Sequence, residues 1–201
     1  MSLWNTDISN YPIAASTDCK VAVDSEEFSR LGYPMSYGYF NAGVCLINLD
    51  YWRRHNCIKV FVDLLDDAVK LKYHDQDVLN LLFHTSKLDL SIKYNLMCDY
   101  IYKNPLWSNT KFEKEISDAL QEPVIIHYAG GDKPWYKYIR NKSPLSALFY
   151  KYQKYTMWKG IKYDFRSPKL KLINFIADLM RVIGLKPKLS SYELRDVSNI
   201  V

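Results

Sequence analysis

The sequence predicts an α/β fold in which short buried strands alternate with helices. Three short apolar runs, residues 13–15, 44–47 and 124–126, have the length and composition of strands. Between them lie segments whose apolar residues recur at helical spacing. A chain of 201 residues can bury one sizeable core, so one domain is the simplest expectation.

The first fifty residues begin this alternation. Residues 3–7 predict a short helix, residues 13–15 a strand, and the polar stretch 18–36 a loop or short helix. The near-continuous apolar run 44–47 is typical of a strand that is covered on both faces.

Two helices and a strand are expected next. Asp50 is a candidate N-cap for the first helix, and Asp75 for a second helix that runs through Phe83. Residues 88–94 predict a strand. The stripe expected to face the core in the first of these helices is Ile58, Phe61, Leu65 and Ala68.

The last helices are predicted from caps and apolar stripes. Thr110 and Glu113 fit a capping box, ahead of a buried face of Phe112, Ile116, Ala119 and Leu120. Ser143-Pro144 is expected to open a helix with Leu145, Leu148, Phe149 and Tyr152 on one face. A final helix follows Pro168, carries Leu172, Ile173, Ile176, Leu179, Met180 and Ile183 on one stripe, and can end at Gly184.

Charge is divided unevenly along the chain. Residues 1–136 carry 13 Lys or Arg and 18 Asp or Glu, whereas residues 137–188 carry 13 Lys or Arg and 2 Asp. In the basic part, tyrosine and tryptophan alternate with lysine, a composition that suits an anionic membrane surface. The alternative is ordinary helices with solvated lysines. No nucleic-acid partner is expected, because nothing besides this composition supports one.

Other features bear on the compartment. No apolar run approaches the length of about 18 residues that a transmembrane helix needs, and the first residues show no signal-peptide pattern. The four cysteines show no C-x-x-C spacing, so free thiols are expected. We therefore expect a cytoplasmic protein, with a peripheral position at the inner face of the cell membrane as an option.

The residues after the run 124–126 combine several functional types. His127 comes where the predicted strand ends, Gly130 and Gly131 allow backbone N–H groups to approach an anion, and Lys133 adds a charge suited to phosphate. This combination indicates half of a diphosphate–metal site. Local chemistry alone leaves a second interpretation open, a turn with a structural histidine and a solvated lysine.

The string His127 to Trp135 resembles the closing motif of glycosyltransferase family 8, His-x-x-Gly-x-x-Lys-Pro-Trp, at every fixed position. Residues 39–53 resemble the family's central strand and following helix start, and residues 75–80 its Asp-Gln-Asp segment. The segments occur in the family's order, and the resemblance covers roughly residues 3–140. It implies the GT-A fold of nucleotide-diphospho-sugar transferases.

The resemblance also implies roles for individual residues. His127 corresponds to a ligand of Mn²⁺ (or Mg²⁺), and Gly130 and Lys133 to groups that bind the diphosphate of a UDP-hexose. Asn41 and Ala42 correspond to positions that face the donor sugar. The structural alternatives are a capped histidine, a solvated turn and a strand-end turn.

Asp75 and Gln76 are the catalytic candidates that the resemblance implies. Asp75 corresponds to a residue that binds donor sugar hydroxyls, or else only caps its helix. Gln76 corresponds to the residue opposite the leaving group, in a family that retains the anomeric configuration. Because an amide oxygen is a poor nucleophile, a front-face route with Gln76 as a dipolar stabiliser is equally open.

One part of the family pattern is missing from this sequence. Relatives carry an Asp-x-Asp metal motif shortly before the segment that matches residues 3–7, and Asp75-x-Asp77 aligns with a different segment. We therefore expect the C-terminal portion of a GT-A fold with a basic helical tail. Residues 1–136 would form a partial catalytic domain, and residues 137–201 a basic aromatic helical extension.

The implied function is a retaining, metal-dependent hexosyltransferase. It would move galactose or glucose from a UDP-sugar to a glycan or glycolipid acceptor in bacterial surface polysaccharide or lipopolysaccharide synthesis. One rival is a non-catalytic truncated fragment or interaction module of the same fold. Another is a metal-dependent hydrolase that uses Asp75, Asp77 and His127.

Overall fold

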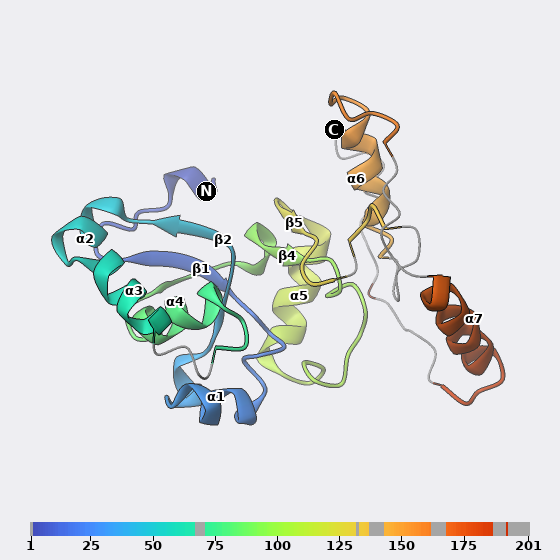
Figure 1. Cartoon of the computed structure of the whole chain (residues 1–201), viewed down its shortest axis with the longest axis horizontal. Helices are drawn as coiled ribbons and strands as arrows, with labels where there is room; N and C mark the ends of the chain where they lie inside the picture. The colour runs from blue at the N-terminus through green and yellow to red at the C-terminus, as the bar shows by residue number, and fades with distance from the viewer. Residues whose placement is uncertain are drawn as a thin grey trace. The chain divides into compact units, whose positions relative to one another are not determined.

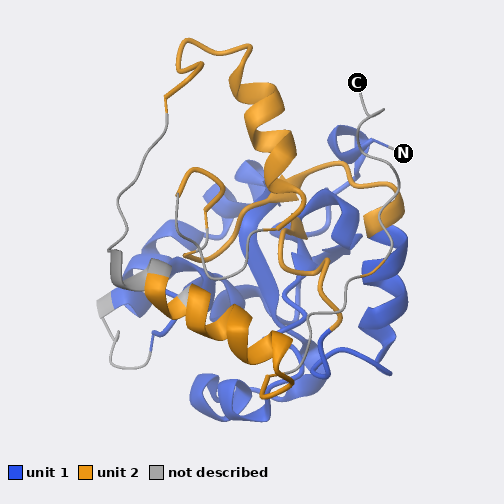
Figure 2. Cartoon of the chain, turned by 90° about the vertical axis from the view of Figure 1, so that its right-hand side faces the viewer, with its two compact units in different colours: residues 1–95, 104–119 blue, residues 96–103, 120–201 orange. Residues whose placement is uncertain are grey.

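The computed structural model describes residues 2–66, 71–131, 133–136, 143–161, 168–186 and 192 (Figure 1). The chain forms two compact units (Figure 2). Unit 1 consists of residues 1–95 and 104–119, and unit 2 of residues 96–103 and 120–201. The predicted boundary at residue 136, between a catalytic domain and a helical extension, is not one of the boundaries of these units and stays a prediction.

Unit 1 is built on a three-stranded sheet of order β2-β1-β3. The central strand β1 (Ile13–Thr17) pairs antiparallel with β2 (Phe40–Ile47) and parallel with β3 (Leu88–Leu90). The predicted strands 13–15 and 44–47 are confirmed. The predicted strand 88–94 is confirmed only to Leu90, because the chain then turns into the 3-10 helix η4 (Ile92–Tyr94).

Side chains from the surrounding segments pack on both faces of this sheet. The described helices before β3 are η1 (Leu3–Asn5), α1 (Ser25–Leu31), η2 (Met35–Tyr37), α2 (Leu49–Arg54), α3 (Cys57–Asp66) and α4 (Asp75–Phe83). Helix α5 (Lys111–Gln121) follows η4 and the short strand β4 (Leu96–Met97). On one face of β1, Ile13 and Ala15 pack with side chains of α2 and α4. On the other face, Ala14 packs with Leu90 and Tyr94.

Successive side chains of β1 point to opposite faces of the sheet and are buried on both, as in a strand that is covered on both sides. Residues 44–47 were also expected to be covered on both faces, but they are covered only in part. Cys45 and Leu46 pack against opposite clusters, but Ile47 is 42% exposed. The reason is that β2 is an outer strand of the sheet.

Two predicted helix caps were wrong by one or two residues. The N-cap of α2 is Asn48, whose side chain accepts a hydrogen bond from the Tyr51 backbone N–H at 2.9 Å, while Asp50 lies inside the helix and pairs with Arg53. Helix α4 begins at Asp75, and its N-cap is His74, which makes no side-chain capping bond. Asp75 therefore does not cap its helix. His74 has a φ of 49°, a conformation that costs backbone free energy for a residue with a Cβ.

The predicted apolar stripe of α3 was partly wrong. Phe61 packs against the core as expected, together with Cys57, whereas Ile58 is 61% and Leu65 is 39% exposed. In this helix Cys57, Phe61 and Leu64 recur at helical spacing, as do Ile58, Phe61 and Leu65, so spacing alone does not choose between the two sets. Ala68 lies outside the described residues.

The buried face predicted for α5 is confirmed, since Phe112, Ile116, Ala119 and Leu120 are all buried. Its capping box is modified. Thr110 Oγ1 accepts from the Phe112 N–H at 3.2 Å, and the Glu113 carboxylate accepts from the Asn109 N–H at 2.7 Å. One side chain before the helix and one in its first turn therefore each accept a hydrogen bond from a backbone N–H at the start of α5.

Unit 2 holds a parallel pair of short strands and two helices. Strand β4 (Leu96–Met97) pairs with β5 (Ile126–His127), and α6 (Ser146–Gln153) and α7 (Pro168–Val182) follow. The predicted start of α6 at Ser143-Pro144 is two residues early. Leu145 and Leu148 are buried, but Tyr152 is 56% exposed.

Helix α7 ends as predicted, and Gly184 behind it has the left-handed φ of 78°. The apolar stripe predicted on α7 faces solvent in the described structure. Among the described residues, no helix has the length and apolarity needed to cross a bilayer. Cys19, Cys45, Cys57 and Cys98 form no disulfide, as expected.

Candidate active site

Four hydrogen-bonded polar side chains, three of them buried and Gln76 half-buried, lie together where β1 ends. Asp18, the residue directly after β1, accepts a hydrogen bond from Asn41 Nδ2 at 3.2 Å and a longer one from Gln76 Nε2 at 3.5 Å. Asn41 Oδ1 in turn accepts from Asn95 Nδ2 and from the Gly43 N–H, each at 2.9 Å. We call Asp18, Asn41, Gln76 and Asn95 the polar ring.

The fold brings the ring together from four separate segments. Asp18 follows β1, Asn41 is the second residue of β2, Gln76 lies in the first turn of α4, and Asn95 follows η4. Gln76 also accepts a hydrogen bond from the Ala42 N–H through Oε1, at 3.0 Å. Three predicted site residues, Asn41, Ala42 and Gln76, therefore lie together.

Asp75 lies at the exposed side of this group. Burial, with a smaller contribution from the charge of Asp75, raises the pKa of the Cys45 thiol to about 11. The Asp75 carboxylate is thus close to β2 as well as to the start of α4. The structure places the four predicted unit 1 residues in one region, while their roles remain predictions.

Asp18 and Asn95 were not identified from the sequence. Asp18 is 6% and Asn95 is 2% exposed, so both are buried polar groups whose hydrogen bonds are formed inside the protein. A signal for Asp18 existed. It is the first charged residue after a buried strand with a parallel neighbour, and ligands in α/β proteins bind at the carboxyl ends of such strands. Asn95 carried no comparable signal.

Asp77 fixes the segment that leads into α4. Its carboxylate receives a bidentate pair from Arg30, at 2.8 and 3.0 Å, and a hydrogen bond from Tyr39 OH at 2.7 Å. The backbone N–H groups of Lys72 and Tyr73 donate to the same carboxylate at 2.7 and 2.8 Å. Its side chain is fully buried.

Burial alone would raise the pKa of Asp77, but the hydrogen bonds from Arg30, Tyr73 and Tyr39 hold it below its usual range. The carboxylate is therefore ionised and engaged within the protein. This arrangement argues against the hydrolase hypothesis, which needs Asp77 as a free ligand or base.

Asn80 joins α4 to β2 one turn further on. Its side-chain amide accepts from the Phe40 N–H at 2.9 Å and donates to the Phe40 carbonyl at 2.8 Å. It also donates to the Gln76 carbonyl at 2.9 Å, and the side chain is fully buried. Asp77 and Asn80 together determine where Gln76 stands relative to Asn41 and Ala42.

The second group of predicted residues belongs to unit 2. His127 ends β5 opposite Met97 and is half-buried, and its carbonyl accepts from the N–H groups of Cys98 and Ala129, each at 2.9 Å. Gly130 has a φ of 70° with open space where a Cβ would stand. Its glycine is thus required by backbone conformation and not by crowding.

Lys133 and Pro134 close this loop against the rest of unit 2. Lys133 Nζ donates to the Tyr128 carbonyl, and Tyr150 OH donates to the Pro134 carbonyl at 2.6 Å. The Trp135 ring lies 5.3 Å from that of Phe149, measured between centroids. Helix α6 therefore packs on the predicted diphosphate loop.

The described residues around His127 do not supply a full set of ligands for a divalent cation. Among the described residues, no three His, Cys, Asp or Glu side chains are grouped so that they could hold a metal ion. His127 is a single candidate ligand, and most sites for Mn²⁺ or Mg²⁺ are built from several oxygen or nitrogen groups. The described residues alone do not form the predicted metal site.

Comparison with known proteins agrees with the resemblance. A model of the family described as glycosyl transferase family 8 matches residues 1–138. General stress protein A of Bacillus subtilis is 28% identical over 79% of this chain and 55% of its own length. A lipopolysaccharide 1,2-glucosyltransferase of Escherichia coli is 37% identical over 71% of this chain and 42% of its own length.

Solved structures give the same fold. The galactosyltransferase LgtC, in a complex with donor and acceptor sugar analogues, superposes with a TM-score of 0.66 at 26% identity, over 77% of this chain and 55% of LgtC. The bifunctional glycosyltransferase WbbM matches in fold with a TM-score of 0.65. The chain spans about half the length of these relatives. The predicted α/β, GT-A class is confirmed, and the chain belongs to glycosyl transferase family 8.

Proposed function

We propose that this chain serves the transfer of galactose or glucose from a UDP-sugar to a glycan or glycolipid acceptor, with retention of configuration, in lipopolysaccharide or surface polysaccharide synthesis. The names of its relatives support this, since several are lipopolysaccharide glucosyl- or galactosyltransferases. The observation that carries the proposal is the polar ring at the end of β1.

In this proposal Gln76 stabilises charge and does not attack the sugar. The Gln76 side chain is held at both ends, because Oε1 accepts from the Ala42 N–H and Nε2 donates to Asp18. An amide oxygen is a weak nucleophile, but a fixed amide dipole can lower the free energy of a developing positive charge at the anomeric carbon. Preorganisation by Asp77 and Asn80 removes the cost of orienting it.

Asp75, Asn41 and Ala42 would face the donor sugar. Asp75 does not cap α4, so its carboxylate is available to sugar hydroxyls at the entrance of the ring. Asn41 is committed to Asp18 and Asn95 through its side chain. It would act mainly by holding the β2 backbone, beside Ala42, in place.

Gly130 and Lys133 would bind the diphosphate. Lys133 would exchange its bond to the Tyr128 carbonyl for phosphate oxygens, and its charge would stabilise the departing diphosphate. His127 would supply one ligand to Mn²⁺ or Mg²⁺, and the remaining ligands would come from outside the described residues.

Donor binding and transfer are separable in one experiment. Calorimetry would measure UDP binding with and without Mn²⁺ for the wild type, for His127→Ala and for Gln76→Ala. The proposal expects His127→Ala to lose the Mn²⁺-dependent part of the affinity, and Gln76→Ala to keep it. Transfer of labelled hexose from UDP-galactose and UDP-glucose would then be assayed, and Gln76→Ala should lose it.

Two outcomes would redirect the proposal. UDP binding by the wild type with no transfer to any glycan acceptor would identify a non-catalytic interaction module of this fold. An absence of UDP binding in the presence of Mn²⁺ would remove the donor assignment.

We also propose that the helical tail holds the protein against the anionic inner face of the cell membrane, at a cytoplasmic position. Helix α7 has several exposed apolar side chains, among them Leu172 at 61%, Phe175 at 66% and Val182 at 79%. Residues 137–188 carry the basic excess of the chain. An amphipathic basic helix of this kind binds an anionic bilayer surface through buried apolar area and lysine–phosphate attraction. Nucleic acid is not expected as a partner.

A further inference from the structure

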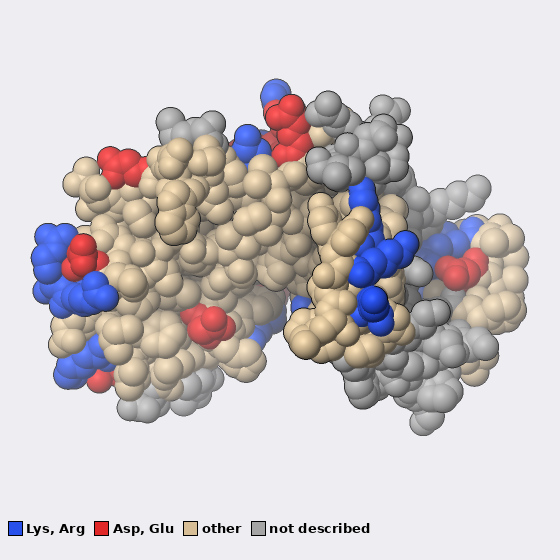
Figure 3. Space-filling model, turned by 90° about the horizontal axis from the view of Figure 1, so that it is seen from above, with Lys and Arg blue, Asp and Glu red and all other residues tan. Residues whose placement is uncertain are grey.

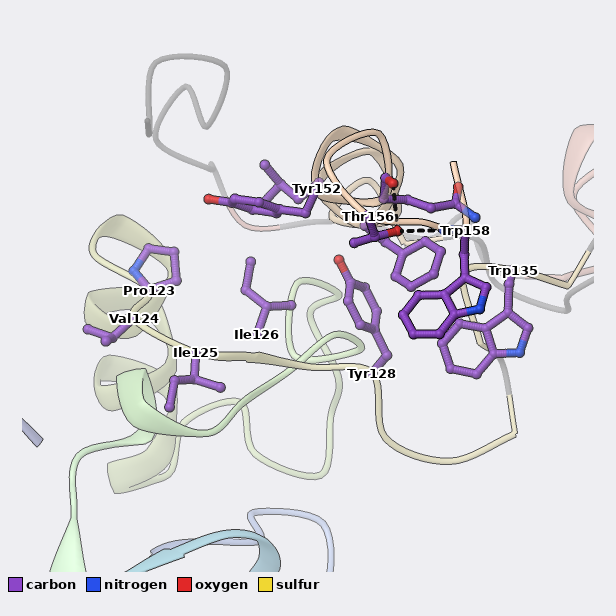
Figure 4. Close-up of a pocket in the computed structure, with 12 residues that line it drawn as sticks. Pro123, Val124, Ile125, Ile126, Tyr128, Trp135, Tyr152, Thr156 and Trp158 are labelled. Atoms are coloured by element: carbon purple, nitrogen blue, oxygen red, sulfur yellow. Dashed lines mark hydrogen bonds between the residues drawn. The ribbon is translucent and has the colours of Figure 1, made fainter. Parts of the chain in front are cut away.

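Unit 2 contains an apolar cavity of about 710 Å³ between the β5 segment and α6 (Figure 4). Its volume lies within the range of about 300–1,000 Å³ that is usual for small-molecule sites. Figure 4 shows the side chains of both segments around one space. The lining residues used below are Val124, Tyr128, Trp135, Tyr152, Thr156 and Trp158.

Three polar side chains of the cavity wall, Tyr128, Gln153 and Thr156, form hydrogen bonds within the protein. Tyr128 OH donates to the Leu145 carbonyl at 2.7 Å, and burial raises the pKa of Tyr128 to about 12. Thr156 Oγ1 donates to the Gln153 carbonyl at 2.8 Å and accepts from the Trp158 N–H at 3.2 Å (Figure 4).

The Gln153 side-chain amide donates to the Ile161 carbonyl at 2.8 Å. A sugar or nucleotide that used these groups would have to break the bonds that they already make within the protein, which costs free energy. An apolar ligand incurs no such cost. The wall therefore favours hydrocarbon over a sugar ring.

The cavity opens beside an exposed amphipathic turn. At the cavity, Val124 is 58% exposed, Tyr152 56% and Trp158 55%. The turn that follows α6, residues 154–161, exposes Tyr155 and Met157, each at 82%.

Lys154 and Lys159 are exposed on the same turn, and basic side chains gather over α6 and this turn (Figure 3). Aromatic rings and lysines in this combination are typical of the headgroup level of an anionic bilayer.

We propose that this cavity binds one acyl chain of an anionic membrane lipid, while Lys154 and Lys159 meet the phosphates of the headgroup region. Charge complementarity selects this occupant, since the rim is basic and the interior is apolar. The proposal goes beyond sugar transfer and does not depend on it. A membrane-attached tail would then hold a lipid in a defined site in addition to a surface contact.

The first experiment measures binding of cis-parinaric acid, a fatty acid whose fluorescence rises in an apolar site, to the full chain without vesicles. We expect saturable binding to one site. Val124→Trp should narrow the entrance and weaken binding about tenfold. Val60→Trp, at a 44% exposed position of α3 in unit 1, is the matched control and should leave binding unchanged.

The second experiment tests the bilayer as the source of the chain. Phosphatidylglycerol vesicles with acyl chains brominated near the middle should quench the fluorescence of Trp135 and Trp158. The quenching should be lost in Trp135→Phe/Trp158→Phe and kept in Trp4→Phe, whose side chain in unit 1 is 90% exposed. Lys154→Glu/Lys159→Glu should reduce quenching by these vesicles and leave parinaric acid binding within twofold.

The proposal is overturned by either of two results. Parinaric acid binding that is not saturable, or that is equally weak in folded Val124→Trp and Val60→Trp, would exclude an acyl-chain site. A concentration-dependent dimer in gel filtration that Val124→Trp dissociates, and that parinaric acid does not displace, would make a second copy of the chain the occupant.

Discussion

The region around the polar ring of unit 1 buries polar atoms, whereas helix α7 of unit 2 exposes apolar side chains. Around the ring, Asp77 and Asn80 are fully buried and their polar atoms have partners inside the protein. On α7, Phe175 is 66% and Val182 is 79% exposed. Unit 1 has thus enclosed hydrogen-bonding groups, whereas α7 presents hydrocarbon to its surroundings.

This difference indicates where each region gets its specificity. A buried polar network has one low-energy arrangement, so the position of Gln76 is determined by the fold. An exposed apolar helix gains its free energy only when something covers it. Substitutions should therefore change stability in unit 1 and association in α7.

The largest effect is expected from Asp77→Asn. The substitution replaces the buried carboxylate by a neutral amide, and breaking a buried ion pair costs about 3–5 kcal/mol. Arg30 is 20% exposed and keeps its ion pair with Glu27 at 2.8 Å, so the loss should lie at the lower end of that range. Urea unfolding followed by circular dichroism measures the loss. Asp63→Asn is the control, since the pair of Asp63 with Lys59 is exposed and is worth about 0–1 kcal/mol. Equal losses in the two variants would contradict a structural role for Asp77.

The Asp77 carboxylate should also make the free energy of unfolding depend on pH in the acid range. The pKa of Asp77 is lowered in the folded state, so its contribution to stability is complete above the unfolded value of about 3.9 and is lost as the pH falls through the folded-state pKa. The difference in unfolding free energy between wild type and Asp77→Asn should therefore be constant at neutral pH and shrink below about pH 4. A gap that persists unchanged at pH 2 would mean that the pair is not the cause.

The sequence predicted the alternation of strands and helices well, because the buried strands are short continuous apolar runs. The run 124–126 is the exception in its bounds, since only Ile126 and His127 pair in β5. Details that depend on one residue were less predictable. Asn48 and Asp50 are both good caps two positions apart, and Cys57 and Ile58 each begin a set of apolar residues at helical spacing in α3. Tertiary packing decided each case.

The site was half predictable for a related reason. Asn41, Ala42 and Gln76 stand in motifs that are contiguous in the sequence, and the structure places them together. Asp18 and Asn95 are single residues separated by more than seventy positions, and hydrogen bonds through Asn41 connect them. No local pattern encodes a partnership of that kind. The roles predicted for His127, Gly130 and Lys133 stay predictions.

A smaller loss is expected from Asn80→Ala. The change leaves the Phe40 N–H and carbonyl unpaired in a buried position, and each unsatisfied group costs about 1–3 kcal/mol. It also frees the Gln76 carbonyl, so donor-dependent activity should fall together with stability. Asn10→Ala, at an exposed turn position without a positive φ, is the control. If Asn80→Ala matches Asn10→Ala in urea unfolding, the clamp between α4 and β2 does not contribute.

Gly130→Ala tests the loop of unit 2. Because no atom lies within 4 Å of the added Cβ, the cost comes from the φ of 70° alone and should be about 1–2 kcal/mol. Gly130→Asn should cost less, since asparagine tolerates this conformation better than alanine. Thermal unfolding would rank the two variants, and a larger loss for Asn than for Ala would show that crowding controls the position.

The smallest effect on stability is expected on α7. Ile176→Ser/Leu179→Ser removes apolar area that is already 47% and 49% exposed, so the unfolding free energy should change by no more than about 0.5 kcal/mol per site. If a bilayer covers this face, the same change should weaken sedimentation with phosphatidylglycerol vesicles about tenfold. Ile58→Ser/Val62→Ser, on the exposed side of α3, makes a matched loss of apolar area in unit 1. A comparable loss of vesicle binding in both pairs would mean that the bilayer responds to exposed hydrocarbon anywhere on the molecule. A loss confined to α7 would mean that this helix, and not hydrophobicity in general, directs the attachment.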